Sequence, residues 1–288
     1  MTTTGELHFL KMEGCGNSFI VIFEAQGGSR DWAALGRRLM DPHFGLGSDG
    51  LMIVHPSERA DFEVLMYNPD GSQMGMCGNG IRCVARFLIL EGLLEARRGR
   101  VVFDVAGRLI TCRLEEEGRW AQVDMGEPSL APGSIPVNSA KELIDAELVA
   151  GGRRLNFSAV SMGNPHCVIF VEKLTDVNCC ELGPLIENHA LFPERTNVEF
   201  VEVLESRRLR VQVWERGAGL TLGCGTGACA AVVVGVLRGL CARQTTVDLP
   251  GGSLSIEWEE KSNRVFMTGP AKEICRGTFY PQVLAGYQ

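Results

Sequence analysis

Met76-Cys77-Gly78-Asn79-Gly80 and Gly223-Cys224-Gly225-Thr226-Gly227 are two short runs that each place a cysteine among glycines. Each run follows a short alternating segment and precedes an apolar, helix-forming one, at residues 81–94 and 228–242. The local pattern is therefore strand, tight turn, helix, and the glycines allow the sharp turn. We expect each thiol beside the unpaired N–H groups of a helix N-terminus, which stabilise a thiolate and attract a bound carboxylate.

The two cysteine loops belong to an internal repeat. Cys77 and Cys224 lie 147 residues apart in a chain of 288 residues. The same shift relates three further pairs of segments, Gly16-Asn17 to Gly163-Asn164, Leu35-Gly36 to Leu182-Gly183, and Tyr67-Asn68 to Trp214-Glu215. Because these matches are colinear and need no insertion, they predict two copies of one architecture.

Composition and charge limit the class of protein. The chain is 45% hydrophobic and 22% charged, as in ordinary globular proteins, and is long enough for two domains with their own cores. Its net charge of −7 argues against binding to nucleic acid or to an anionic membrane surface. We see no secretory signal and no apolar run near the roughly 20 residues that span a bilayer, so we expect a cytoplasmic protein. The eleven cysteines are an odd number without the spacing of a secreted disulfide scaffold, and most are expected to be reduced.

The predicted elements alternate between strands and helices in both halves. Asp31 is expected to cap a helix at residues 32–40, and a second helix is expected at residues 178–189. A stretch rich in proline, glycine and serine at residues 126–138 is the expected link between halves. The predicted lobes are residues 1–124, completed by residues 272–288, and residues 125–271. Strands are predicted at residues 9–23 (two strands), 51–54, 62–67, 101–105, 108–114, 120–125, 198–203, 209–214, 245–249, 253–258 and 264–268.

No cofactor or metal site is expected from the sequence. The glycines at 45, 47 and 50 match G-x-G-x-x-G, but the run follows a helix and opens onto a strand, whereas a dinucleotide loop does the reverse. None of the five lysines lies in a glycine-rich motif suited to a pyridoxal phosphate Schiff base. The spacings Cys77/Cys83 and Cys224/Cys229 differ from those of zinc knuckles.

Two thiols presented to one molecule have a specific chemistry. If the repeats pack about a pseudo-twofold axis, one thiolate removes a proton from one face of a carbon and the other thiol supplies a proton to the opposite face, so the carbon inverts. The amides at the two helix N-termini stabilise negative charge on the adjacent carboxylate as the C–H bond breaks.

The sequence resembles the diaminopimelate epimerases, which interconvert the LL and meso forms of 2,6-diaminopimelate without pyridoxal phosphate. Ten motifs in order carry the resemblance, and together they are specific. They are Lys11-Met12 with Gly16-Asn17-x-Phe19, Phe44-Gly45-x-Gly47-x-Asp49, Asn68-x-Asp70-Gly71-Ser72, Met76-Cys77-Gly78-Asn79-Gly80-x-Arg82-Cys83, Asp124-Met125-Gly126, Gly163-Asn164-Pro165-His166, Pro193-x-Arg195-Thr196-Asn197-Val198, Glu215-Arg216-Gly217, Cys224-Gly225-Thr226-Gly227-Ala228-Cys229 and Pro250-Gly251-Gly252.

The resemblance implies an α/β fold of the α+β type, with two pseudo-twofold-related lobes, each a mixed β-sheet or barrel around a central α-helix. It implies a homodimer, a place in the synthesis of lysine and cell-wall precursors, and Cys77 and Cys224 as the acid/base pair. Arg216 suits bidentate pairing with the second carboxylate. The substrate-binding residues that the resemblance implies are Asn17, Asn68, Gly78, Asn79, Asn164, Asn197, Glu215, Arg216, Gly225 and Thr226.

Some positions depart from the family pattern. Gly50 stands where some relatives carry Gln, Leu220 replaces an acidic residue, Ser18 replaces an Asp and Gly223 replaces an Ala. These departures leave the substrate open, and a racemase of another amino acid, such as histidine, is the nearest alternative. A thiol redox protein fits less well because no C-x-x-C is present. A noncatalytic anion-binding module would use the helix N-termini but would tolerate replacement of both cysteines by serine.

Overall fold

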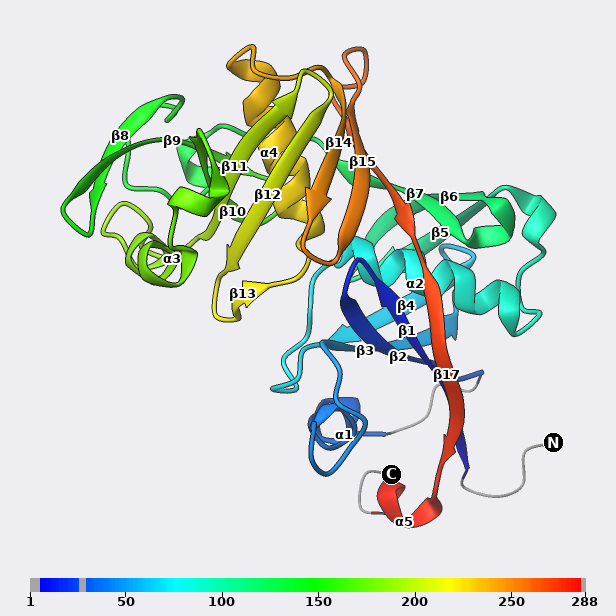
Figure 1. The fold of residues 1–288 in the computed structure, drawn as a ribbon. Helices are drawn as coiled ribbons and strands as arrows, with labels where there is room; N and C mark the ends of the chain where they lie inside the picture. The colour runs from blue at the N-terminus through cyan, green and yellow to red at the C-terminus, as the bar shows by residue number, and fades with distance from the viewer. Residues whose placement is uncertain (1–5, 26–29, 286–288) are drawn as a thin grey trace. The chain divides into compact units, whose positions relative to one another are not determined.

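The computed structural model describes residues 6–25 and 30–285 of the chain (Figure 1). The chain divides into two compact units, Met1–Val123 with Gly269–Gln288, and Asp124–Thr268. The lobes predicted from the sequence are meant as units that fold separately, and their boundaries stay a prediction. Each unit is described here by itself.

The first unit is a mixed sheet packed on helices. Strands β2 and β3, and strands β4 and β5, pair in parallel, while β1–β2, β3–β4, β5–β6 and β6–β7 are antiparallel. The returning strand β17 pairs antiparallel with β1. The elements are β1 (Leu7–Gly14), β2 (Asn17–Phe23), α1 (Trp32–Met40), β3 (Gly50–Pro56), β4 (Phe62–Tyr67), α2 (Gly78–Leu90), the 3₁₀ turn η1 (Ala96–Arg98), β5 (Arg100–Val105), β6 (Arg108–Glu115), η2 (Glu116–Gly118), β7 (Trp120–Gly126), β17 (Lys272–Phe279) and α5 (Pro281–Leu284).

The second unit repeats this arrangement. Strands β10 and β11, and strands β12 and β14, pair in parallel, while β9–β10, β11–β12, β14–β15 and β15–β16 are antiparallel. Short strands β8 and β13 pair with β9 and β12. The elements are η3 (Pro132–Ser134), β8 (Ala146–Ala150), β9 (Arg153–Ser161), β10 (Pro165–Val171), η4 (Leu174–Asp176), α3 (Cys179–Glu187), β11 (Asn197–Glu205), β12 (Arg208–Glu215), β13 (Gly219–Thr221), α4 (Gly225–Leu237), β14 (Gln244–Leu249), β15 (Gly252–Trp258) and β16 (Val265–Pro270).

The repeat predicted from the sequence is confirmed by the order of these elements. The parallel and antiparallel pairings follow the same sequence in both units. Helices α1 and α3, strands β3 and β11, and helices α2 and α4 each begin 147 residues apart. A residue of the first unit therefore has a structural equivalent 147 positions later, and the two copies of the site can be compared atom by atom.

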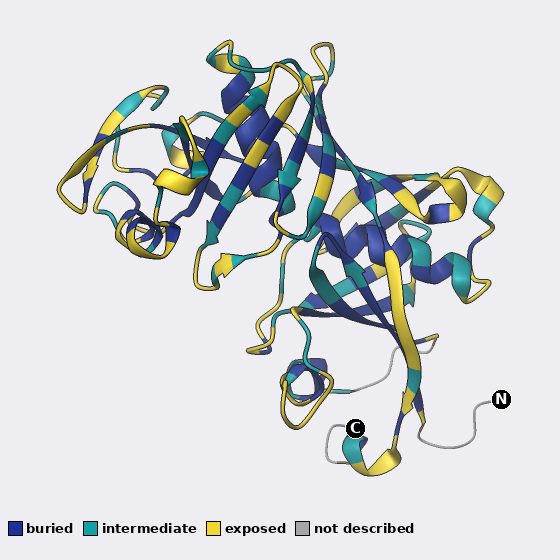
Figure 2. Ribbon diagram, viewed as in Figure 1, coloured by how far each residue is buried: buried dark blue, intermediate teal, exposed yellow. Residues whose placement is uncertain are grey.

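Each sheet surrounds one buried helix, α2 or α4. Helix α4 has no charged residue, and every residue from Gly227 to Gly235 is buried (Figure 2). A helix that is apolar all round is a core helix. Helix α2 also buries Arg82, whose Nε donates to Pro270 O at 3.2 Å and so ties the helix to the returning end of the chain. The mixed α/β class expected from the sequence is confirmed.

The ends of these two helices correct the sequence prediction. Both helices begin three residues earlier than the apolar runs that predicted them, directly after Cys77 and Cys224. They also end earlier than predicted, at Leu90 and Leu237. In each case a glycine just beyond the end, Gly92 or Gly239, has a φ of 69°. This left-handed conformation terminates a helix although the apolar run continues.

Candidate active site

The two cysteines occupy equivalent positions at helix N-termini. Cys77 is the N-cap of α2, and its Sγ accepts a hydrogen bond from Gly80 N at 3.4 Å. Cys224 is the N-cap of α4, and its Sγ accepts from Gly227 N at 3.3 Å. Both sulfurs therefore contact an amide that the helix itself leaves unpaired, an arrangement that favours a thiolate.

Each cysteine loop makes an equivalent side-chain hydrogen bond with an asparagine outside the loop. In the first unit, Asn79 Nδ2 donates to Asn17 Oδ1 at 2.7 Å. In the second unit, Asn164 Nδ2 donates to Thr226 Oγ1 at 3.3 Å. Each bond joins the residue two positions after the cysteine to the asparagine that follows the preceding hairpin turn. Four predicted site residues thus form two matching pairs, one in each unit.

Asn68 lies in a turn that is closed by hydrogen bonds from the side chains of the turn itself. Its Nδ2 donates to Ser72 Oγ at 3.0 Å, and Asp70 Oδ1 accepts from the hydroxyl and the N–H of Ser72 at 2.6 and 2.8 Å. These two bonds lower the pKa of the Asp70 carboxyl. The turn follows β4, and six residues after it the chain reaches Gly78, the first residue of α2.

Cys224 is buried and has acidic neighbours. Burial raises the pKa of the Cys224 thiol well above its ordinary value, and the carboxylates of Glu215 and Glu199 raise it further. The Thr226 hydroxyl, 3.4 Å from Sγ, and the Gly227 N–H act in the opposite direction. At Cys224, burial and the two carboxylates therefore outweigh the helix N-terminal amide, and the net effect favours the protonated thiol.

Glu215 is the last residue of β12 and lies beside the Cys224 thiol. Its Oε1 accepts from the Thr221 hydroxyl at 2.6 Å, and its side chain is hydrogen-bonded to Cys224. Burial raises the pKa of the Glu215 carboxyl, and the bonds to Thr221 and Cys224 partly offset that rise. Such a carboxyl, beside a reactive thiol, has an environment typical of functional sites.

A buried histidine and glutamate lie beneath the second cysteine loop. His166 Nδ1 is 2.7 Å from Glu199 Oε1, both side chains have no exposed surface, and His166 Nε2 is 3.0 Å from Asn164 Oδ1. Glu199 Oε2 has no hydrogen-bond partner among the described residues. Glu199 is not among the predicted site residues, because it lies inside a predicted strand and no motif distinguishes it.

The same positions in the first unit are apolar. The residues 147 positions before His166 and Glu199 are Phe19 and Met52, and the residue equivalent to Glu215 is Asn68. A Cβ at Gly227 would lie 2.8 Å from Glu199 Oε1, and a Cβ at Gly80 would lie 2.5 Å from Met52 Cε. The glycine of each loop therefore lies close to a side chain, but only that of the second loop approaches a carboxylate.

Asn197 and Arg216 are joined to each other. Asn197 Oδ1 accepts from Arg216 N at 2.9 Å, and its Nδ2 donates to Pro165 O at 2.8 Å. Arg216 Nη1 donates to Glu194 O at 3.1 Å. Both polar side-chain atoms of the buried Asn197 thus have a partner within the protein, and the bond to Arg216 N places the backbone of that residue.

The positions that depart from the family pattern lie near these groups. A Cβ at Gly50 would lie 3.1 Å from Cδ1 of Phe19, so a larger residue there requires the Phe19 ring to shift. Leu220, in β13, is 45% exposed and precedes Cys224 by four residues. Neither residue contributes a polar atom.

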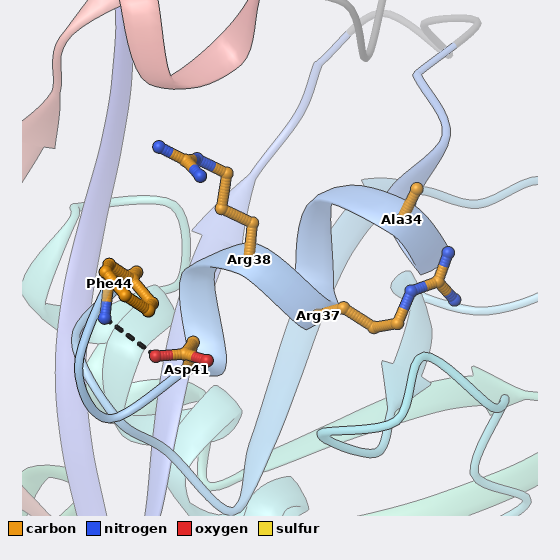
Figure 3. A pocket seen from close by; sticks show the side chains of 5 residues that line it. All are labelled: Ala34, Arg37, Arg38, Asp41 and Phe44. Carbon is orange, nitrogen blue, oxygen red and sulfur yellow. Dashed lines mark hydrogen bonds between the residues drawn. The ribbon is translucent and has the colours of Figure 1, made fainter.

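A separate open pocket of about 320 Å³ lies on helix α1 (Figure 3). Ala34, Arg37, Arg38, Asp41 and Phe44 line it, and Phe44 N donates to Asp41 Oδ1 at 2.7 Å. None of these five is a predicted site residue. The described residues contain no group of three or more metal-ligating side chains, and none of their helices is long and apolar enough to span a bilayer.

The chain is similar to known proteins over nearly its whole length. The family model described as diaminopimelate epimerase matches residues 9–131 and 158–274. The diaminopimelate epimerase of Pelotomaculum thermopropionicum is 48% identical over 278 residues, which are 95% of this chain and 99% of that protein. The corresponding protein of Moorella thermoacetica is 46% identical over 277 residues, with the same coverage of 95% and 99%.

Solved structures share the fold at low sequence identity. A hydroxyproline epimerase from Agrobacterium vitis with bound trans-4-hydroxy-L-proline has a TM-score of 0.70 and 13% identity, covering 96% of this chain and 93% of that one. A phenazine biosynthesis protein of the PhzF family from Bacillus anthracis has a TM-score of 0.71 and 15% identity, covering 96% and 99%.

Proposed function

The chain belongs to the diaminopimelate epimerase family, and from this membership we propose how its residues interconvert LL- and meso-2,6-diaminopimelate. The enzyme is an isomerase of an amino-acid stereocentre. The observation that carries the mechanism is the equivalent placement of Cys77 and Cys224 as N-caps of two core helices, each with its sulfur on a helix amide. The proposal requires both units to present these loops to one substrate molecule.

The proposed reaction moves one proton off the α-carbon and another onto it. In one direction the Cys77 thiolate takes the α-proton, and the Cys224 thiol gives its proton to the opposite face of the resulting carbanion. Cys77 then holds a proton and Cys224 is a thiolate, so the reverse reaction begins from that state. The acidic surroundings of Cys224 support it as the protonated partner in the substrate-free enzyme. No cofactor takes part in these steps.

The proposed binding groups differ in the charge of the substrate group that each of them binds. Backbone amides of Gly78, Asn79, Gly225 and Thr226 hold the carboxylate at the reacting carbon, where negative charge develops. Arg216 holds the distal carboxylate as a charge-assisted pair. Acceptors for the two ammonium groups come from Glu215 and the site asparagines, which are Asn17, Asn68, Asn164 and Asn197.

Turnover of LL-diaminopimelate tests this proposal against a racemase of another amino acid. Gly50 and Leu220, which add no polar atom, are the reason to keep that alternative. We expect the meso form to accumulate from LL-diaminopimelate and no racemisation of histidine or other single-carboxylate amino acids. Racemisation of one of those with diaminopimelate left unchanged would overturn the substrate assignment. Disulfide reduction without α-proton exchange would instead indicate a thiol redox protein.

We also propose a cytoplasmic homodimer. Strand β17 is largely exposed and carries Ile274 at 55% exposure, and Tyr280 directly beyond it is 76% exposed (Figure 2). Exposed apolar residues on an edge strand are typical of a protein interface. Sedimentation equilibrium of the purified enzyme is expected to give twice the 31.4 kDa chain mass. A monomer at micromolar concentration would contradict the dimer.

A further inference from the structure

Glu187, the last residue of α3, is a buried carboxylate outside the predicted site. It is 5% exposed. Its Oε2 accepts from Trp214 Nε1 at 2.7 Å, and its Oε1 accepts from Gly217 N at 2.9 Å and from Arg195 Nη1 at 3.2 Å. Three donors from two separate segments therefore converge on one side chain.

The partners of Glu187 flank the two charged site residues of the second unit. Trp214 directly precedes Glu215, and Gly217 directly follows Arg216. The carboxylate thus holds both ends of the dipeptide Glu215-Arg216. Because one bond is from a backbone N–H and the other from a half-buried indole, the turn that carries Arg216 is fixed on both sides.

Arg195, the third partner of Glu187, belongs to a second segment that contacts Arg216. Arg195 has a left-handed φ of 61°, which costs free energy for a residue with a side chain. It lies between Glu194, whose carbonyl accepts from Arg216 Nη1, and Asn197, whose Oδ1 accepts from Arg216 N. Glu187 therefore contacts both segments that determine where the Arg216 guanidinium lies.

The fold itself does not require a carboxylate at this position. The equivalent residue of the first unit, at the end of α1, is Met40, which is buried and apolar. There the corresponding turn is closed by Asn68, Asp70 and Ser72. A carboxylate at a helix C-terminus is disfavoured by the helix dipole, and its burial carries a desolvation cost. Its presence in the second unit points to a use that the first unit lacks.

We propose that Glu187 is a positioning residue for recognition of the second carboxylate of the substrate, acting by fixing the turn that presents Arg216. This inference rests on the proposed function, because it assumes that Arg216 binds that carboxylate. It predicts that Glu187 affects the binding of a dicarboxylate substrate more than the proton transfer at the α-carbon.

Kinetics of two variants test this proposal. Glu187→Met copies the residue found at the equivalent place in the first unit, and Glu187→Gln keeps the shape but has only one acceptor oxygen. We expect KM for diaminopimelate to rise on the order of tenfold in Glu187→Met and less in Glu187→Gln, with kcat changed by less than about threefold. Glu181→Gln, on an exposed position of the same helix, is the matched control and is expected to leave both constants unchanged.

A double variant separates positioning from general destabilisation. If Glu187 acts through Arg216, then Glu187→Met adds almost no further loss of kcat/KM to Arg216→Ala. Multiplied losses, or a fall in kcat with KM unchanged, would overturn the proposal. Wild-type enzyme that does not turn over diaminopimelate would instead refute the proposed function, and with it any role of Glu187 toward that substrate. Active wild type with normal KM in the Glu187 variants would refute this inference alone.

Discussion

The two catalytic candidates share their local geometry but differ in their charged surroundings. Each sulfur accepts one amide hydrogen bond at the start of a core helix. Glu215 and Glu199 raise the pKa of the Cys224 thiol, whereas the residues equivalent to them beside Cys77 are Asn68 and Met52. The two cysteine positions are therefore similar, and the carboxylates near Cys224 raise the pKa of that thiol.

Glu215→Gln is expected to make Cys224 reactive at lower pH. A neighbouring carboxylate opposes thiolate formation, so its removal lowers the pKa of the thiol. Because alkylation requires the thiolate, the pH profile of iodoacetamide labelling at Cys224, followed by peptide mass spectrometry, should move to lower pH. Cys77 in the same sample is the internal control. A shift to higher pH at Cys224 would contradict this account.

Alanine at the two loop glycines is expected to have unequal effects. A Cβ at Gly80 meets the flexible end of Met52, which can move aside, whereas a Cβ at Gly227 meets Glu199 Oε1, which His166 holds in place. Gly227→Ala should therefore destabilise the protein by roughly 1–3 kcal/mol, and Gly80→Ala by less. Urea unfolding measures both, with Gly133→Ala, which meets no atom within 4 Å, as the control. Equal losses of unfolding free energy in the two alanine variants would argue against a rigidly held Glu199 carboxylate.

At the scale of elements, the sequence predicted where strands and helices lie better than where they end. Asp31 caps α1 as expected and accepts from Ala34 N at 2.9 Å. Strands such as β4, β12 and β16 could be located by periodicity because their more and less buried residues alternate. Periodicity did not locate the ends of α2 and α4, where the apolar run continues beyond the helix. Nor did it identify Glu187 and Glu199, because a charged residue within an element becomes informative only when its partners from distant segments are known.

Gly239→Ala isolates the contribution of one helix terminus. Gly239 has a φ of 69°, and a Cβ there would meet nothing within 4 Å, so the substitution introduces conformational strain without a clash. We expect a loss of about 1 kcal/mol in the free energy of unfolding. Chemical denaturation checks this value. Gly75→Ala, also without a nearby atom and without a positive φ, is the control, and an equal effect of the two substitutions would contradict the helix-termination argument.

At the scale of the whole molecule, one architecture occurs twice and each copy supplies one thiol. The first copy is completed by β17, which pairs with β1 from Leu7 opposite Phe279 to Glu13 opposite Lys272. The two copies differ at positions where two identical sites would not suffice for the proposed substrate. At the positions equivalent to Glu187, Glu199 and Glu215, the first unit has Met40, Met52 and Asn68. In the proposed mechanism, only the second unit supplies a guanidinium, that of Arg216, for a second carboxylate. Under the proposed function, this difference between the units matches a substrate with two different ends.

The isotope pattern early in turnover tests the central claim that two thiols act on opposite faces of one carbon. LL-diaminopimelate is incubated with the enzyme in D₂O, and samples are taken before the reaction reaches equilibrium. The two isomers are separated, and the deuterium content of each is measured by mass spectrometry. With two acid/base groups, the proton removed from one face is not the one delivered to the other, so the new meso form carries deuterium while the remaining LL form stays unlabelled. Meso product that retains the substrate's own hydrogen, or inversion that continues in both Cys77→Ser and Cys224→Ser, would contradict the account.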